Sequence, residues 1–345
     1  MAQVATLRDR GTPDRLTIGR KAFEAILPPL IGGLLILAAL VGLIGTAIRN
    51  PQPHDIPMGL VGPAPAIQQL SGGFESKAPG AFQFHSYASV DAALAAIDAR
   101  SVDGVLVLGD GGPRLILAGA AGDAVTGVIS GAVTNAFRAQ GQAVTMETVH
   151  PFASGDAHGL ILFFVVLAVL VSTLVAQALV SLRSDAGLRV RLVMVGVFGC
   201  LAPLVGMGTA AWIADGYGSG FWTATGLVGL AAAAIGAVVA GSARLLGAAG
   251  VGLAALVVVL LDLVASGGPL GSHLLPDFYR WLAPGMPAGQ LYSAVRGALY
   301  FDNAGLGMPI AVLGAWLAGG LVLIVLGELR ARGGRARVSG LGGLQ

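Results

Sequence analysis

The chain contains 345 residues, of which 55% are hydrophobic and only 11% are charged, and its formal net charge is +2. Because soluble proteins carry about 25% charged residues, this composition excludes a free soluble enzyme. The small net charge gives no support for nucleic acid as a partner, and the single cysteine, Cys200, excludes an intrachain disulfide and a cysteine-based zinc site.

Six apolar stretches of about 20 residues predict six helices that cross a membrane. They cover residues 26–48, 159–182, 192–213, 221–241, 245–265 and 308–327. The first is longer than the apolar core of a signal peptide, which has about 7–15 residues, so we expect an uncleaved anchor. Small residues within the later stretches fit either close helix packing or the lining of a pore.

The distribution of basic residues predicts the orientation of these helices. Six crossings place the segments 1–25, 183–191, 242–244 and 328–345 on one side of the membrane. Thirteen of the twenty Lys and Arg residues lie in these segments: Arg8, Arg10, Arg15, Arg20, Lys21, Arg183, Arg189, Arg191, Arg244, Arg330, Arg332, Arg335 and Arg337. We therefore expect both termini in the cytoplasm, at the cytoplasmic (inner) membrane, with 328–345 as a disordered basic tail.

Residues 49–158 have a different pattern, which predicts a small α/β domain outside the membrane. Strands are expected at 56–61, 81–87, 105–108, 115–117 and 143–149. Helices are expected at 64–75, after the capping residue Ser89, and at 122–139. The expected fold class is an α-helical integral membrane protein with six transmembrane helices and this domain inserted between the first and second.

Residues 266–307 are too polar to span a membrane and are rich in aromatic residues. Six of the aromatic residues lie between positions 278 and 301: Phe278, Tyr279, Trp281, Tyr292, Tyr300 and Phe301. Such side chains favour the headgroup layer. The segment predicts two short helices joined at 284–287, which either lie at the outer interface or form a re-entrant pair.

One span, an outer α/β domain and five further spans form an order that resembles an ABC-type exporter permease subunit of the YhgE/Pip-like branch. The resemblance is carried by Leu275-Pro-Asp-Phe-Tyr279, Met286-Pro-Ala-Gly289, Val295-Arg296 and Tyr300-Phe301. It extends to 308–316 and to the helix–strand unit at 89–108. It implies export or an envelope role at the cytoplasmic membrane, and it brings Pro287 and Tyr300 among the candidate site residues.

Nucleotide hydrolysis by this chain is excluded, because a phosphate-binding loop requires Gly-Lys-Ser/Thr and the two lysines follow Arg20 and Ser76. Any ATPase must be a separate cytoplasmic chain, and no cofactor is expected. The cytoplasmic segments 183–191 and 242–244 offer such an ATPase little surface.

Three charged residues are candidates for function. Asp262 lies inside the fifth stretch and is either a proton or cation relay, or an acid that reaches the headgroups or caps the 266–268 turn. Arg296 is expected to pair with Asp277 or with a lipid phosphate.

A second cluster is predicted on the two connections of the outer domain. It consists of His54, Asp55, His150, Asp156 and His158, which could converge to bind a metal ion or sense pH. The more ordinary interpretation is a pair of solvated polar linkers.

Two functions remain open. The first is export of an amphipathic or lipid-like molecule by a homodimer or heterodimer with a separate ATPase. The second is a non-transporting envelope receptor or scaffold whose outer domain binds partners or a ligand.

Overall fold

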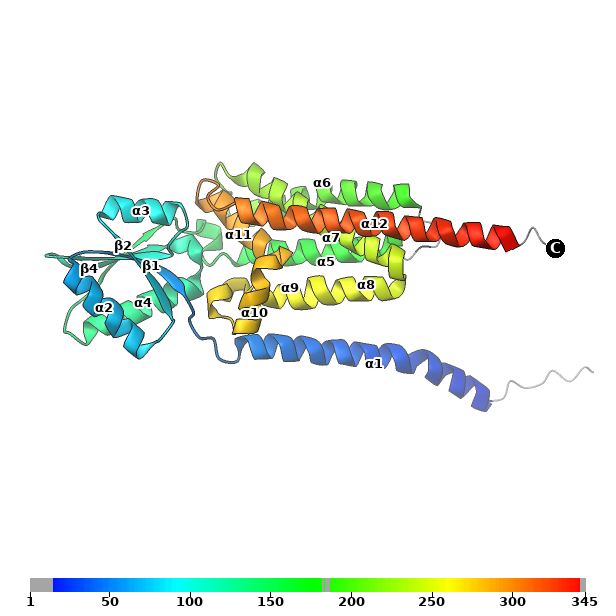
Figure 1. Ribbon diagram of the computed structural model, residues 1–345, viewed down its shortest axis with the longest axis horizontal. Helices are drawn as coiled ribbons and strands as arrows, with labels where there is room; N and C mark the ends of the chain where they lie inside the picture. Colours follow the sequence, from blue (N-terminus) through cyan, green and yellow to red (C-terminus); the bar gives the residue numbers. More distant parts are fainter. Residues whose placement is uncertain (1–14, 182, 184–186, 342–345) are drawn as a thin grey trace, which may run out of the picture. The chain divides into compact units, whose positions relative to one another are not determined.

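The computed structural model describes residues 15–181, 183 and 187–341. The chain divides into two compact units, Met1–Thr46 and Ala47–Gln345. The larger unit contains a five-stranded sheet domain and a set of packed helices (Figure 1).

Within the described residues, six helical segments are long and apolar enough to cross a membrane, as the sequence predicts. They are Leu30–Ile48, Leu160–Ser181, Leu188–Ile213, Phe221–Leu246, Ala248–Leu270 and Gly307–Arg332. The protein is therefore an α-helical membrane protein that passes the bilayer several times.

Helix α1 (Arg15–Ile48) forms the described part of the first unit as far as Thr46. It begins before the expected start at residue 26, inside the segment predicted as a cytoplasmic terminus. Leu34, Leu35, Ile36 and Leu37 point in successive directions around the helix, and each is more than half exposed. A helix that is apolar on every side is typical of a lipid-embedded segment.

The sheet domain contains all five predicted strands and all three predicted helices. The strands are β1 (Ile56–Val61), β2 (Phe82–Tyr87), β3 (Gly104–Gly109), β4 (Gly112–Ala118) and β5 (Thr145–Val149), in the order β2-β1-β3-β4-β5. The helices are α2 (Ala64–Lys77), α3 (Val90–Asp98) and α4 (Asp123–Arg138). The Ser89 side chain accepts the Ala92 N–H at 3.2 Å and caps α3, as expected.

Alternating side chains of the central strands build two cores. Leu106 and Leu115 pack in the core under α2 and α4, whereas Val105 and Ile116 pack in the core that includes α3. β1 is parallel to β2 and β3, and β4 is antiparallel to β3, so the start of β3 and the end of β4 lie at the same end of the sheet. That end of the sheet faces the packed helices.

The helical part of the larger unit is built around α7. Its helices are α5 (Leu160–Ser181), α6 (Leu188–Ile213), α7 (Phe221–Leu246), α8 (Ala248–Ala255), α9 (Asp262–Ala265), α10 (Asp277–Leu282), α11 (Pro287–Tyr300) and α12 (Gly307–Leu341), with a π-helical turn at Leu256–Leu261 between α8 and α9. α7 contacts α5, α6, α11 and α12. Its many alanines and glycines allow these neighbours to approach closely.

Close packing accounts for several of the small residues in the membrane segments. A Cβ at Gly241 would lie 2.6 Å from the Leu323 Cβ, and one at Gly229 would lie 2.8 Å from the Gly199 carbonyl oxygen. A Cβ at Gly314, by contrast, would meet nothing within 4 Å. Close helix packing therefore explains Gly229 in the α6–α7 contact and Gly241 in the α7–α12 contact, but it does not explain Gly314.

The prediction of a disordered tail from residue 328 is wrong as far as Leu341, because α12 continues to that residue. Glu328 and Arg332 lie four residues apart on the same helix face, with Arg332 Nε 3.4 Å from Glu328 Oε1. This ion pair stabilises the helix beyond residue 328. Residues 342–345 lie outside the described part of the chain.

The segment 266–307 forms two helices, as predicted, but they have different surroundings. α11 contacts α5, α7, α9 and α12, and most of its side chains are buried by protein. α10 leaves Phe278 and Trp281 exposed, at 57% and 78%. Only α10 therefore has the exposed aromatic surface expected of an interfacial helix.

Candidate functional site

A polar cavity of about 750 Å³ lies between the sheet domain and the segment that contains α10 and α11. The sheet domain contributes the turn after α3, the start of β3 and the end of β4, and the helical part contributes α10, α11 and the turns before them. The charged and imidazole side chains on its wall are Arg100, Asp103, His273, Asp277, Arg280 and Arg296. We call it the junction cavity.

Arg100 attaches the sheet domain to α11. It lies two residues after the end of α3 and has φ of 57°, in the left-handed region. Its Nη1 donates to the Ser293 carbonyl at 2.9 Å, and its Nη2 donates to the Ser293 hydroxyl at 3.0 Å. The guanidinium also lies 5.3 Å from the centroid of the Phe301 ring, within cation–π range.

Arg296 forms the reverse attachment, from α11 to the sheet domain. Its Nη1 donates to the carbonyl oxygens of Ala120 at 3.2 Å and Ala121 at 2.5 Å, and its guanidinium lies 4.6 Å from the Tyr292 ring centroid. Its Nε is buried and has no hydrogen-bond partner among the described residues. Arg296 therefore retains an unused donor beside the cavity.

The three arginines differ in how their charge is balanced. Arg280 pairs with Asp277 at 3.1 Å and with Asp55 at 2.5 Å. Arg100 and Arg296 form no ion pair with a carboxylate in the described part of the chain. Burial, together with the charge of Arg296, lowers the pKa of Arg100 to about 10, so this side chain remains positive at neutral pH. Two of the three arginines on the wall therefore have no direct ion-pair partner among the described residues.

Asp103 is the acid nearest to this charge. Its backbone is fixed at the start of β3, where its N–H donates to the Pro57 carbonyl at 2.9 Å and its carbonyl accepts from the Ala118 N–H at 3.0 Å. Burial raises the pKa of Asp103, and the nearby His273, Arg296 and Arg100 oppose that rise. Protonation of Asp103 therefore changes the charge of the cavity.

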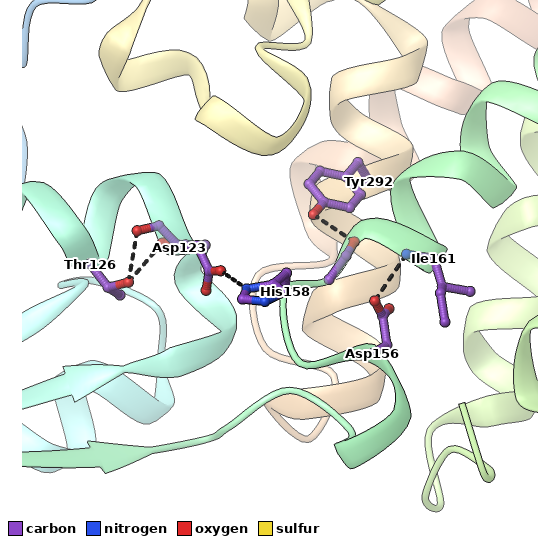
Figure 2. Close-up of polar contacts among 8 residues, drawn as sticks. Asp123, Thr126, Asp156, His158, Ile161 and Tyr292 are labelled. Carbon is purple, nitrogen blue, oxygen red and sulfur yellow. Dashed lines mark hydrogen bonds and ion pairs between the residues drawn. The ribbon is translucent and has the colours of Figure 1, made fainter. Parts of the chain in front are cut away.

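The connection between β5 and α5 is fastened at three points (Figure 2). The Asp156 carboxylate accepts the Ile161 N–H at 2.9 Å and the Leu162 N–H at 3.3 Å, which caps α5. His158 contacts Asp123 at the start of α4, and the Tyr292 hydroxyl donates to the Gly159 carbonyl at 3.2 Å. α11 thus contacts both this connection and the sheet domain.

Tyr300, at the end of α11, adds a fourth contact to the same connection. Its hydroxyl accepts the Ala153 N–H at 3.4 Å, and its ring packs edge-on against Phe152 at 5.4 Å between centroids. Burial raises the pKa of Tyr300 to about 12, so the hydroxyl stays neutral.

Asp262 and Pro287 position the start of α11. The Asp262 side chain is fully buried, and its two carboxylate oxygens accept the Ala288 N–H at 2.8 and 3.0 Å. Pro287 occupies the first turn of α11, where a missing N–H costs nothing. The expectation that Asp262 reaches the headgroups or caps the 266–268 turn is wrong, because its carboxylate binds a different helix.

The structure brings some of the candidate residues together and corrects their roles. Asp277 and Arg296 both line the junction cavity, but the expected ion pair between them is absent. Asp277 binds Arg280 instead, because both lie on α10 three residues apart, whereas Arg296 is held by sheet-domain carbonyls. Asp262, Pro287 and Tyr300 support α11 rather than facing one common site.

The predicted cluster of histidines and acids does not converge. Each of its members has a separate partner: His54 contacts His273, Asp55 binds Arg280, His150 binds Asp98, Asp156 caps α5 and His158 binds Asp123. Among the described residues no group of three or more His, Cys, Asp or Glu side chains could hold a metal ion. The two connections leave the domain at separate places, which keeps these side chains apart.

Arg100, Asp103, Ser293 and His273 are site residues that the sequence interpretation missed. The grouping of Asp98, Arg100 and Asp103 in a chain of low charge was a usable signal. Nothing in the sequence indicates that Arg100 meets Ser293, 193 positions later.

The chain matches no protein-family model, and no curated protein matches it.

Proposed function

We propose that this protein is the membrane-spanning subunit of an ABC-type exporter that moves an anionic amphipathic or lipid-like molecule outward, with energy from a separate ATPase chain. The observation that carries the proposal is the pair Arg100 and Arg296, whose charges are unbalanced by carboxylates in the described part of the chain, on a polar cavity beside the membrane helices. A buried positive charge favours an anionic partner.

The orientation in this proposal follows the basic residues. Both termini are placed in the cytoplasm and the sheet domain outside the inner membrane, since thirteen of the twenty Lys and Arg residues then lie inside. The junction cavity would open at the outer headgroup level, near the exposed aromatic side chains of α10. A phosphate or carboxylate head could bind there while the apolar part remains among lipids.

The separate ATPase and a homodimeric or heterodimeric assembly are part of the same proposal. They rest on the resemblance of the domain order and of residues 275–301 to the YhgE/Pip-like permeases. The protein itself would perform no hydrolysis and would contribute the route.

The proposal is tested with the full chain in nanodiscs of phosphatidylcholine with or without phosphatidylglycerol. We expect the anionic lipid to raise the Tm of the wild type and to co-purify with it, and both effects to weaken in Arg100→Gln and Arg296→Gln. Arg114→Gln is the matched control, because Arg114 lies outside the junction cavity and pairs with Glu147 at 3.7 Å. Equal responses of all four proteins would overturn the anion site.

The ATPase is tested separately by affinity purification in mild detergent followed by mass spectrometry. Recovery of a nucleotide-binding chain supports the exporter. Recovery of envelope proteins without such a chain supports a receptor or scaffold instead. That second function is favoured by the short connections, since α5 ends at Ser181, α6 begins at Leu188 and only Gly247 separates α7 from α8.

A further inference from the structure

Helix α5 carries a polar face inside an otherwise apolar membrane segment. Thr173, Gln177 and Ser181 follow one another at intervals of four residues, so they lie on one side of the helix. Their exposed fractions are 0%, 0% and 7%. We call these three residues the α5 polar face.

The polar atoms of this face lack hydrogen-bond partners. Thr173 Oγ1, both amide atoms of Gln177 and Ser181 Oγ are buried, and none has a partner among the described residues. Hydroxyls in membrane helices ordinarily bond to a carbonyl of their own helix. Thr225 does so with Phe221 at 2.7 Å, and Ser172 does so with Val169 at 3.3 Å.

The neighbouring helix leaves room for the Gln177 amide. Gly236 of α7 faces it, and a Cβ at Gly236 would lie 3.2 Å from Gln177 Nε2. The lack of a side chain at Gly236 lets the Gln177 amide pack directly against the backbone of α7, where no apolar side chain separates the two helices.

The polar face leads to charged residues at the end of α5. The Ser181 carbonyl accepts from Arg191 Nη2 at 3.0 Å. Arg244 and Glu328 form an ion pair at 3.0 Å between α7 and α12, and the charges of both lie near the Arg191 guanidinium. In the first half of α5, the same side of the helix is apolar and includes Val166, which is 1% exposed.

An unpartnered amide in the interior of a membrane protein is strongly unfavourable, since neither water nor lipid can bond to it. Three consecutive polar positions of this kind are therefore expected only if a polar occupant visits them. Water has the donors and acceptors that all four atoms require.

We propose that the α5 polar face lines a hydrophilic passage between α5 and α7, which is closed in this structure and which water enters from the Arg191, Arg244 and Glu328 end.

The test uses single-cysteine variants of the full chain in phosphatidylcholine nanodiscs. Cys200 is exposed and is first replaced by alanine. Ser181→Cys, Gln177→Cys and Thr173→Cys are then treated with a charged, water-soluble methanethiosulfonate, and labelling is followed by intact-protein mass spectrometry. The controls are Val166→Cys, on the same side of α5, and Leu179→Cys, which is 65% exposed to the lipid side.

We expect the three polar-face cysteines to react at least about tenfold faster than both controls, in the order 181, 177, 173, because only a hydrated thiol forms the reactive thiolate. Gln177→Leu should slow the labelling of Thr173→Cys by a similar factor while the Tm stays at or above that of the parent. Rates equal to those of the controls, or a lower Tm with unchanged labelling at position 173, would overturn the passage. If Gln177→Cys does not fold, positions 181 and 173 carry the same comparison.

The labelling requires neither an ATPase nor a known substrate, so it can succeed even where the exporter proposal fails.

Discussion

Arg100 and Ser293 lie 193 positions apart in the sequence, and two hydrogen bonds join the guanidinium of one to the carbonyl and hydroxyl of the other. Ser293 belongs to α11, which also packs against α5, α7 and α12. A single helix thus connects the sheet domain with the membrane helices.

The Ser293 hydroxyl is expected to stabilise this connection. Ser293→Ala removes a hydrogen bond from a charged donor, and such bonds contribute about 1.5–3 kcal/mol. We expect a lower Tm and faster amide exchange at the start of β3. Ser76→Ala is the control, since among the described residues the Ser76 hydroxyl donates to the Gly73 carbonyl of its own helix. Equal effects of the two substitutions would contradict the role of Ser293.

Asp103 should make both stability and anion affinity depend on pH. Its folded pKa is raised by burial, so the charged form is penalised at pH values above that pKa, and the penalty disappears below about 3.9, the ordinary value for Asp. Asp103→Asn should therefore be more stable than the wild type at neutral pH and equal to it in acid.

The same carboxyl should weaken anion binding as the pH rises, because its ionisation reduces the positive charge of the junction cavity. Phosphatidylglycerol binding is therefore measured against pH in the wild type and in Asp103→Asn. The profile of Asp103→Asn should be flatter than that of the wild type, and an unchanged slope would exclude Asp103.

Asp262 is expected to act as a cap for α11. Asp262→Ala leaves the Ala288 N–H without its acceptor and should cost about 1–2 kcal/mol, as for other helix caps. Asp262→Asn keeps an acceptor and should cost less. Thermal unfolding of both variants checks this order, and loss of export in a stable Asp262→Asn protein would instead identify a proton or cation relay.

Gly241 should be essential for the contact between α7 and α12. A Cβ at this position would lie 2.6 Å from the Leu323 Cβ and 2.9 Å from the Ile324 nitrogen, and the backbone cannot move away cheaply. Gly241→Ala should therefore destabilise the protein by about 1–3 kcal/mol. Gly226→Ala on the same helix meets nothing within 4 Å and should be neutral or slightly stabilising. Thermal unfolding in nanodiscs compares the two.

The orientation can be tested in cells with impermeant thiol reagents and a Cys200→Ala background. Ser76→Cys, in α2, should react from outside, and Ser184→Cys, at a position outside the described residues, should react only after the membrane is opened. Labelling of both from outside would contradict six crossings with cytoplasmic termini.

The sequence by itself determined the parts of this protein that depend on local pattern. Apolar stretches of sufficient length specified six membrane segments, because only helices satisfy the backbone in lipid. The alternating and capped segments between 56 and 149 specified five strands and three helices, since side-chain periodicity and Ser89 act within a few residues.

Only the tertiary structure decided which polar side chains meet. From the sequence, Arg296 was expected to pair with Asp277 or with a lipid phosphate, and five residues of the connections formed either a cluster or two solvated linkers. In the folded chain, Asp277 instead forms an ion pair with Arg280, Arg100 donates hydrogen bonds to Ser293, and Gln177 is buried against Gly236. A polar side chain bonds to whatever donor or acceptor the packed backbone brings within about 3 Å, and that choice depends on residues far away in the sequence.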